Sequence, residues 1–211
     1  MEVLTILSAL CFTALVVAKP TTTTKECQLP ALKEVDSNML TGTWYLVLTP
    51  VQPFEEMMPC FAAKNVRDSG KGTYVRGMII YPSKDTVEIE DIPLHYFAMN
   101  HTSINYMDPK YEFIFADSAK RHGIGEEGMK EVKGVFSLGA SQVTDYENYL
   151  IWVECAFNGD KYALAYTRTN HPSAENILQI HNALAEIGGE WSQIPLHLAG
   201  CTKFDIPFAE I

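Results

Sequence analysis

The chain is dominated by short runs of β-branched and aromatic residues that alternate with polar residues and end at turn-forming residues. Alternation with a period of two is typical of strands that bury one face. The eight runs are Thr43–Thr49, Cys60–Arg67, Thr73–Tyr81, Thr86–Ile92, Tyr111–Ala116, Glu131–Val143, Asn148–Phe157 and Lys161–Thr169. Pro93 interrupts the fourth run, and we expect Leu94–Asn105 to continue that strand after a bend. So many short strands favour an antiparallel barrel or sandwich.

One amphipathic helix follows the strands. Its apolar stripe consists of Ile177, Ile180, Leu184 and Ile187, which recur at helical spacing. Ser173 is a suitable start for this helix, and Gly188 is a suitable end. Because the strands come first and the helix last, we expect the helix to pack on the outside of a closed sheet.

Composition and charge restrict the class of protein and its partners. The 211 residues are 47% hydrophobic and 20% charged, which is typical of a soluble globular chain with one domain or at most two small ones. The formal net charge is −10 at pH 7. A field of this sign repels nucleic acids, so we expect no nucleic-acid partner.

The N-terminus has the pattern of a secretory signal. Residues 3–18 are mostly apolar, too short to span a bilayer comfortably, and end in the small residues Val16, Val17 and Ala18. Glu2 does not fit this pattern, because the segment before the apolar stretch of a signal peptide usually contains Lys or Arg. The alternative is a buried helix or a signal anchor. We expect residues 1–18 to be removed and residues 19–211 to form one secreted domain without membrane insertion.

Four cysteines lie beyond the signal: Cys27, Cys60, Cys155 and Cys201. In an exported chain an even number predicts two disulfides, with three connectivities open. The cysteines are far apart and have no histidine pair beside them, so we expect no zinc site. Asn100-His101-Thr102 is the only N-x-S/T sequon, which predicts one glycosylation site at Asn100.

Three separated motifs then point to a family. Gly42-Thr43-Trp44 begins the first run, Thr144-Asp145-Tyr146 precedes the seventh, and Arg168 lies near the end of the eighth. In this order the chain resembles a lipocalin, and Thr144–Cys155 is similar to arthropod lipocalins such as insect bilin-binding proteins and cockroach secretory lipocalins. The resemblance covers residues 19–211. It implies an all-β fold, an eight-stranded up-and-down antiparallel barrel with one C-terminal helix outside.

The resemblance also implies structural roles for particular residues. In lipocalins the motif tryptophan closes one end of the barrel beneath the motif arginine, so Trp44 and Arg168 are expected to stack. The related insect proteins pair their first cysteine with the third and their second with the fourth. Carried over, these pairs are Cys27–Cys155 and Cys60–Cys201.

A barrel of eight strands is just wide enough to hold one small ligand. With Trp44 and Arg168 inward and Cys155 outward, alternation along the strands predicts which side chains line the interior. The predicted ligand-binding residues are Leu46, Leu48, Tyr111, Phe113, Phe115, Leu150, Trp152, Glu154, Tyr162, Leu164 and Tyr166. Most of them are apolar or aromatic, as in small-molecule pockets.

Glu154 has two interpretations. An inward carboxylate could pair with a cationic ligand, as in amine-binding arthropod lipocalins. Alternatively, the strand ends there and Glu154 is solvated at the rim, or a bulge reverses its direction. We favour the alternative, in which Glu154 does not face the ligand.

No pattern in the sequence predicts catalysis. The six histidines form no HExxH motif, and no nucleophile elbow, P-loop or dinucleotide-binding motif is present. With all four mature cysteines expected in disulfides, we predict no enzyme activity, no catalytic residue, no metal and no required cofactor.

The sequence therefore predicts a secreted carrier of one small hydrophobic ligand. The candidates are a bilin pigment, a pheromone or odorant, and a fatty acid or retinoid, and the residues do not decide among them. The alternatives are a nutritive or structural secreted protein and a lipocalin that sequesters biogenic amines. Whether the chain forms a homo-oligomer stays open.

Overall fold

The structure is a computed structural model. It describes residues 27–50, 59–82, 87–98, 103–111, 114, 117, 120–121, 123, 125–126, 139–155 and 159–204. The predicted signal at residues 1–18, the sequon at Asn100 and the predicted lining residues Phe113 and Phe115 lie outside the described residues.

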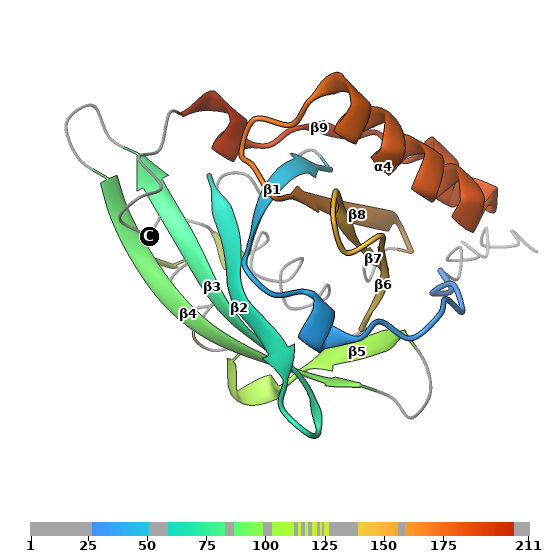
Figure 1. Cartoon of the computed structure of the whole chain (residues 1–211). Coiled ribbons are helices and arrows are strands. Elements are labelled where there is room, and N and C mark those ends of the chain that lie inside the picture. The colour runs from blue at the N-terminus through green and yellow to red at the C-terminus, as the bar shows by residue number, and fades with distance from the viewer. Residues whose placement is uncertain are drawn as a thin grey trace, which may run out of the picture.

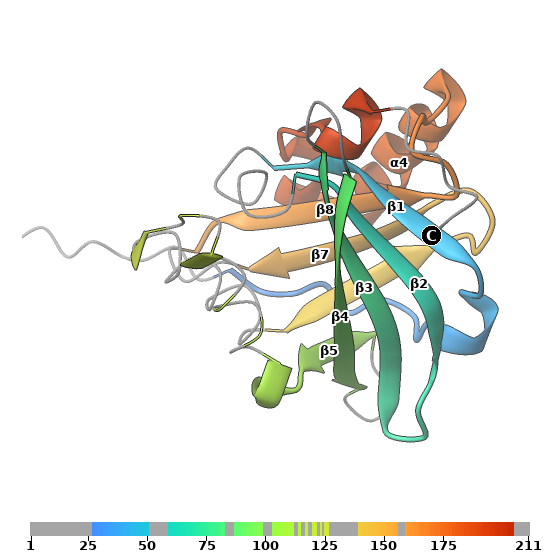
Figure 2. The same cartoon turned by 90° about the vertical axis from the view of Figure 1, so that its left-hand side faces the viewer.

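Eight antiparallel strands close into a ring (Figure 1). They are β1 Thr43–Thr49, β2 Phe61–Asp68, β3 Gly72–Pro82, β4 Val87–Ala98, β5 Ile104–Met107, β6 Ala140–Thr144, β7 Leu150–Cys155 and β8 Lys161–Thr167. Consecutive strands are paired from β2 to β8, and β1 pairs with both β8 and β2. The up-and-down barrel expected from the sequence is confirmed. Figure 2 shows the long β3 and β4 crossing the face of the barrel that is turned to the viewer.

The middle of the chain differs from the prediction. The fifth strand is Ile104–Met107, whereas the strand predicted over Tyr111–Ala116 is wrong at the residues described there. Tyr111 ends the 3-10 helix η2 Pro109–Tyr111, and Ile114 is helical. Tyr111 and Ile114 both pack against the interior, because residues three apart share one side of a helical backbone.

Pro93 does not bend β4 out of the sheet. It lies opposite Arg76 in an unbroken ladder with β3 that runs from Val87 to Phe97. Proline cannot donate a backbone hydrogen bond and is tolerated where a strand has a free edge. In the described pairings β5 meets β4 only at Tyr96–Ala98, so the neighbouring strand makes no use of the N–H that Pro93 lacks.

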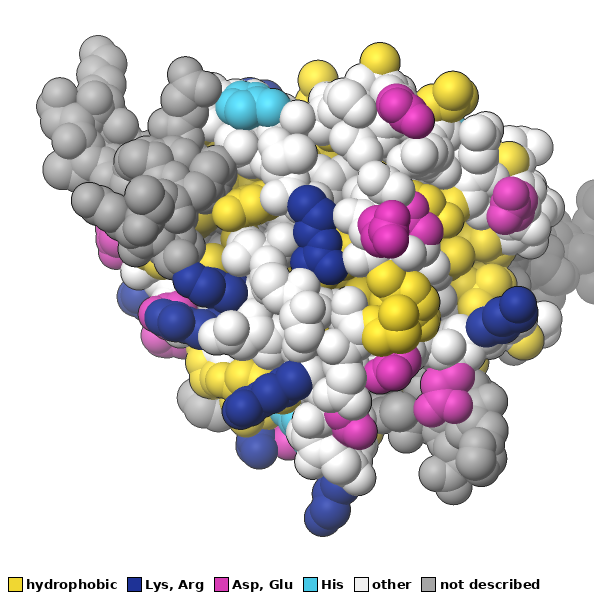
Figure 3. All heavy atoms as spheres, viewed as in Figure 1, with side chains coloured by type: hydrophobic (Ala, Val, Ile, Leu, Met, Phe, Trp, Pro, Cys, Tyr) yellow, Lys and Arg dark blue, Asp and Glu magenta, His cyan; other side chains and the backbone are white. Residues whose placement is uncertain are grey.

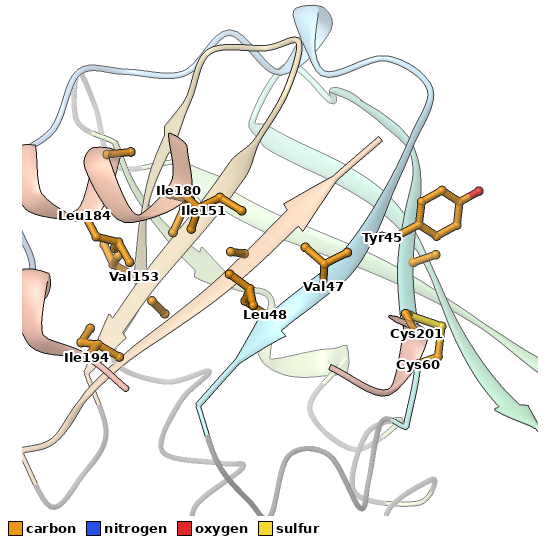
Figure 4. Packing of buried hydrophobic residues seen from close by; sticks show 14 of the residues in the cluster. Tyr45, Val47, Leu48, Cys60, Ile151, Val153, Ile180, Leu184, Ile194 and Cys201 are labelled. Carbon is orange, nitrogen blue, oxygen red and sulfur yellow. A yellow bond between two sulfur atoms is a disulfide. The ribbon is translucent and has the colours of Figure 1, made fainter. Parts of the chain in front are cut away.

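The helix α4 Ala174–Ile187 packs outside the barrel wall, as predicted. Ser173 caps its start, because the Ser173 side chain accepts a hydrogen bond from the Asn176 backbone N–H at 3.1 Å. Ile180 and Leu184 pack with Ile151 and Val153 of β7, and Figure 4 shows the four side chains between helix and sheet. These four residues, together with Ala163 and Ala165 of β8, belong to a second buried apolar cluster, called here the outer cluster. It holds the helix against β7 and β8.

Short elements complete the chain on either side of the barrel. They are the 3-10 helices η1 Ser37–Met39, η3 Gly189–Gln193 and η4 Gly200–Lys203, and the strand β9 His197–Leu198. The strand β9 pairs with the end of β1. The disulfides Cys27–Cys155 and Cys60–Cys201 are both present and attach the segments before β1 and after α4 to the wall.

Trp44 closes one end of the barrel. Its side chain is 0% exposed, and its indole N–H donates to the Leu40 carbonyl at 3.0 Å. The Arg168 guanidinium lies 3.5 Å from the centre of the indole ring and donates to the Thr41 and Tyr146 carbonyls. The cation–π contact and the two hydrogen bonds therefore join three separate segments at this end.

The Thr144-Asp145-Tyr146 turn is built around one carboxylate. Asp145 accepts hydrogen bonds from the backbone N–H groups of Glu147, Asn148 and Tyr149 at 2.7–3.0 Å. Burial opposes ionisation of Asp145, but these hydrogen bonds outweigh it and lower its pKa. The turn thereby holds the Tyr146 carbonyl where Arg168 donates to it.

Replacing Arg168 by Met should lower the free energy of unfolding by about 3 kcal/mol, because the cation–π contact of this half-buried guanidinium with the buried Trp44 ring and two charged hydrogen bonds are lost. Urea denaturation measures the effect. Arg67→Met is the matched control, since Arg67 is exposed and lies 4.8 Å from the Tyr74 ring. The control should lose less than about 1 kcal/mol. Equal losses in the two variants would show that the Arg168 contact does not stabilise the barrel end.

Removing the Cys60–Cys201 disulfide with a double Ala substitution should lower the free energy of unfolding by about 5 kcal/mol in the chain-entropy model. The two cysteines are separated by 141 residues, so the bridge restricts much of the unfolded chain. Removing Cys27–Cys155, with a separation of 128, should have an effect of similar size. Thermal and urea unfolding check both values, and a loss below about 1 kcal/mol in either would contradict the model.

Candidate functional site

The barrel interior contains most of the described residues that were predicted to bind a ligand. Leu46, Leu150, Trp152, Leu164 and Tyr166 belong to one buried apolar cluster inside the ring, called here the inner cluster. Tyr111 packs against this cluster from η2. Tyr162 is half-buried and, by alternation along β8, lies on the same side as Leu164 and Tyr166.

Leu48 is a correction to the prediction. It belongs to the outer cluster beneath α4, not to the interior, and Figure 4 shows it beside Val47. Leu46 lies opposite Tyr166 while Leu48 lies opposite Ala165, so β1 uses one extra residue at this point. Such a β-bulge reverses the side-chain alternation beyond it. The bulge therefore turns Leu48 outward.

Several interior residues were missed by the sequence prediction. On β4, Ile92, Leu94 and Tyr96 line the inside at every second position, and this alternation across Pro93 was a usable pattern in the sequence. Further inner-cluster residues are Phe61, Ala63, Val66, Val75, Ile79, Met107 and Ala140. Their strands were predicted in part, but which face of each strand points inward was not.

The inward residues of β6, β7 and β8 form successive levels from the closed end upward. Thr144, Leu150 and Tyr166 are paired nearest the Trp44 end. Gln142, Trp152 and Leu164 form the next level, followed by Ala140, Glu154 and Tyr162. The interior is thus mainly apolar and aromatic, and the adjacent strands β6 and β7 each carry one inward side chain with an unpartnered polar atom, Gln142 and Glu154.

Glu154 lies inside the barrel, so the favoured interpretation of a solvated rim residue is wrong. It is 5% exposed, shares the inward direction of Leu150 and Trp152, and is followed by Cys155, which points outward to Cys27. Burial raises its pKa from the usual value near 4.5 to about 8, so the carboxyl group is mostly protonated at pH 7. Within the described part of the chain, its Oε2 atom has no hydrogen-bond partner.

Gln142 is the second buried polar side chain of the interior. It is 1% exposed, and among the described residues its amide nitrogen Nε2 has no hydrogen-bond acceptor. Its direction follows from its neighbours, because Ala140 lies in the inner cluster whereas Ser141 donates outward to the Pro30 carbonyl at 3.0 Å. The strand containing Gln142 was predicted, but its orientation was not readable from the sequence.

Two tyrosines border this polar pair. Tyr96 of β4 packs against Trp152 with 4.6 Å between ring centres, and Tyr166 of β8 packs edge-on against Phe61 at 6.2 Å. Burial raises the pKa of both phenols, with a smaller contribution from nearby Glu154. Both hydroxyls are therefore neutral at physiological pH, and the interior has no fixed charge among these groups at pH 7.

The remaining surface and metal-binding features add little to the site. In the described segments no group of three or more His, Cys, Asp or Glu side chains is placed to hold a metal ion. Among the helices that the structure describes, none is both long and apolar enough to cross a membrane. On the face in Figure 3, the Lys and Arg side chains are scattered among hydrophobic and acidic ones.

Comparison with known proteins identifies the fold. No protein-family model matches the chain, and a search of the curated proteins finds no match. Among solved structures, the major allergen Per a 4 from cockroaches is similar, with a TM-score of 0.52 and 12% identity, covering 85% of this chain and 99% of that one. Apocrustacyanin C1 is also similar, with a TM-score of 0.52 and 13% identity, covering 86% and 94%. Identity this low shows the fold alone, and the chain has the lipocalin fold that its motifs implied.

The raised pKa of Glu154 predicts a pH dependence of stability. The folded protein keeps its proton up to about pH 8, while an unfolded chain releases it near pH 4.5. The contribution of Glu154 to stability is therefore fully present below pH 4.5 and decreases as pH rises to about 8. Glu154→Gln removes this group, so the variant should gain stability relative to the wild type across that range.

Urea denaturation of both proteins from pH 4 to pH 9 measures this difference, which should reach a few kcal/mol on the order expected for a fully buried carboxyl. Groups other than Glu154 titrate in both proteins and cancel in the comparison. Parallel stability curves would show that Glu154 ionises normally in the folded protein.

Proposed function

We propose that the chain is a secreted carrier that holds one small hydrophobic ligand inside the barrel. The observation that carries this proposal is the composition of the interior, where an apolar and aromatic lining surrounds two buried polar groups without described partners. Small-molecule sites typically combine an apolar wall with a few polar groups that orient the ligand. The lipocalin fold supports the same conclusion at a general level.

The shape of the barrel supports entry from one end only. At the closed end, Trp44 is fully buried beneath Arg168, and Leu40 lies beside it in the inner cluster. Ser37 in η1 and Thr73 in β3 are hydrogen-bonded at 2.5 Å and are both buried. A ligand would therefore enter from the opposite end and lie against Trp152, Leu164 and Tyr166.

Two features support secretion. Both disulfides join segments far apart in the chain, and such bridges persist in oxidising compartments. The apolar residues 3–18 have the composition of a signal sequence. We extend the proposal to removal of residues 1–18, to a single mature domain over residues 19–211 and to glycosylation at Asn100.

A carrier role also suits the chemistry of the interior better than catalysis. The four mature cysteines are in disulfides, so none of them supplies a free thiol nucleophile. We therefore propose a binding function without enzyme activity.

Contact quenching by 1-bromodecane tests the location of the ligand. Bromine quenches tryptophan emission at short range, and Trp152 is interior whereas Trp191 lies in the outer cluster. Saturable quenching by one equivalent should persist in Trp191→Phe and weaken in Trp152→Phe, where Trp44 at the closed end remains as an interior tryptophan. Quenching that survives in Trp152→Phe and disappears in Trp191→Phe would place the ligand outside the barrel, and absence of saturable binding would contradict the carrier function.

A further inference from the structure

We propose that the ligand of this barrel is a neutral, mainly apolar molecule with a carbonyl oxygen, and that Gln142 and Glu154 both donate hydrogen bonds to that oxygen. This inference rests on the proposed carrier function and specifies its ligand class. It excludes cationic amines as the preferred ligand.

Gln142 and Glu154 are close enough to share one ligand atom. Glu154 lies opposite Ala140 in the β6–β7 ladder, and Gln142 lies two residues further along β6, opposite Trp152. Side chains related in this diagonal way have Cα atoms about 7–8 Å apart on the same face of a sheet, within reach of long side chains. Both point inward from adjacent strands on neighbouring levels of the barrel, so their polar ends lie within reach of one ligand atom.

Both groups are buried without a described partner. The Nε2 atom of Gln142 and the Oε2 atom of Glu154 lack hydrogen bonds in the described part of the chain, although both side chains are more than nine-tenths buried. Asn105 of β5, which also points inward, differs from them because its amide donates to the Ser103 carbonyl at 3.0 Å. Buried polar groups in proteins are nearly always hydrogen-bonded, so a bound molecule is the natural partner for this pair.

Gln142 and Glu154 both have a proton to donate, so the ligand group between them must be a hydrogen-bond acceptor. The unpartnered atom of Gln142 is an amide nitrogen, which only donates. Burial raises the pKa of Glu154 to about 8, so at pH 7 its carboxyl group also has a proton to donate. Among the described residues, the titratable side chains nearest Glu154 are Tyr96, Tyr162 and Tyr166, and none of these is a cation that would hold Glu154 ionised. Burial raises the pKa of Tyr96 and Tyr166.

A carbonyl oxygen matches two converging donors, because it has two lone pairs and no proton of its own. An ammonium group fits poorly, since it has donors alone and would leave the Gln142 amide without an acceptor. Trp152 lies opposite Gln142 and two residues before Glu154 on β7, so its ring offers apolar contact for the carbon chain next to the carbonyl.

A matched ligand series tests the proposal: decane, 2-decanone and decylamine, titrated by displacement of N-phenyl-1-naphthylamine from the protein at pH 7. The ketone should bind the wild type about tenfold more tightly than the alkane, as expected for two net hydrogen bonds of ordinary strength. Gln142→Met and Glu154→Met should each reduce this preference several-fold while leaving decane affinity nearly unchanged. Glu154→Gln keeps a donor and should retain the preference for the ketone.

The outcomes separate the two proposals. If decane binds but the ketone gains nothing, or if its advantage survives both Met variants, the carbonyl inference is overturned and the carrier function stands. If decylamine binds most tightly and loses affinity in Glu154→Gln, the site is one for amines and the inference is again overturned. If none of the three ligands displaces the probe, the carrier proposal itself fails.

Infrared spectroscopy gives a second measurement that does not depend on folded variants. The carbonyl stretch of 2-decanone labelled with carbon-13 should shift to lower frequency on binding to the wild-type protein, relative to the same ketone in hexane. A bound ketone whose carbonyl stretch matches that in hexane would overturn the inference, because its oxygen would then accept no hydrogen bond.

Discussion

The barrel depends on β1, the strand that closes the ring. One edge of β1 pairs with β8 and the other with β2, so a sheet that would otherwise end in two open edges has none around the ring. Because of the bulge between Leu46 and Leu48, β1 contributes side chains to both the inner and the outer cluster. Before the bulge, Trp44 and Leu46 face the interior, and after it Leu48 joins the apolar layer beneath α4.

The polar groups of the closed end are hydrogen-bonded, whereas two polar groups deeper in the barrel are not. At the closed end Arg168 donates to two carbonyls, and Asp145 accepts three backbone hydrogen bonds. Further in, Gln142 and Glu154 are buried with donors unused among the described residues. The proposed ligand site therefore rests on two unpaired polar groups inside an apolar barrel whose closed end is hydrogen-bonded.

Much of the fold was predictable because it depends on local patterns. The period-two runs gave β1, β2, β3, β7 and β8 within a few residues, and the apolar stripe with Ser173 and Gly188 gave α4. The fifth strand was missed, because Tyr111–Ala116 alternates more clearly than Ile104–Met107 although it is the latter that pairs with β4 and β6. Pairing with neighbours far along the chain, and not alternation, decides which segment joins a sheet.

The sequence by itself determined the order of most strands and the helix, the residues that close the barrel end, and the inward side chains of β7 and β8, because alternation and motif spacing are local properties. Only the tertiary structure decided that Leu48 turns outward, that Glu154 is buried and that Gln142 lies beside it. A single extra residue in a ladder reverses every side chain beyond it, and the register that brings two strands together is set by contacts between distant segments. Those contacts leave a protonated carboxyl and an amide without described partners inside an apolar barrel.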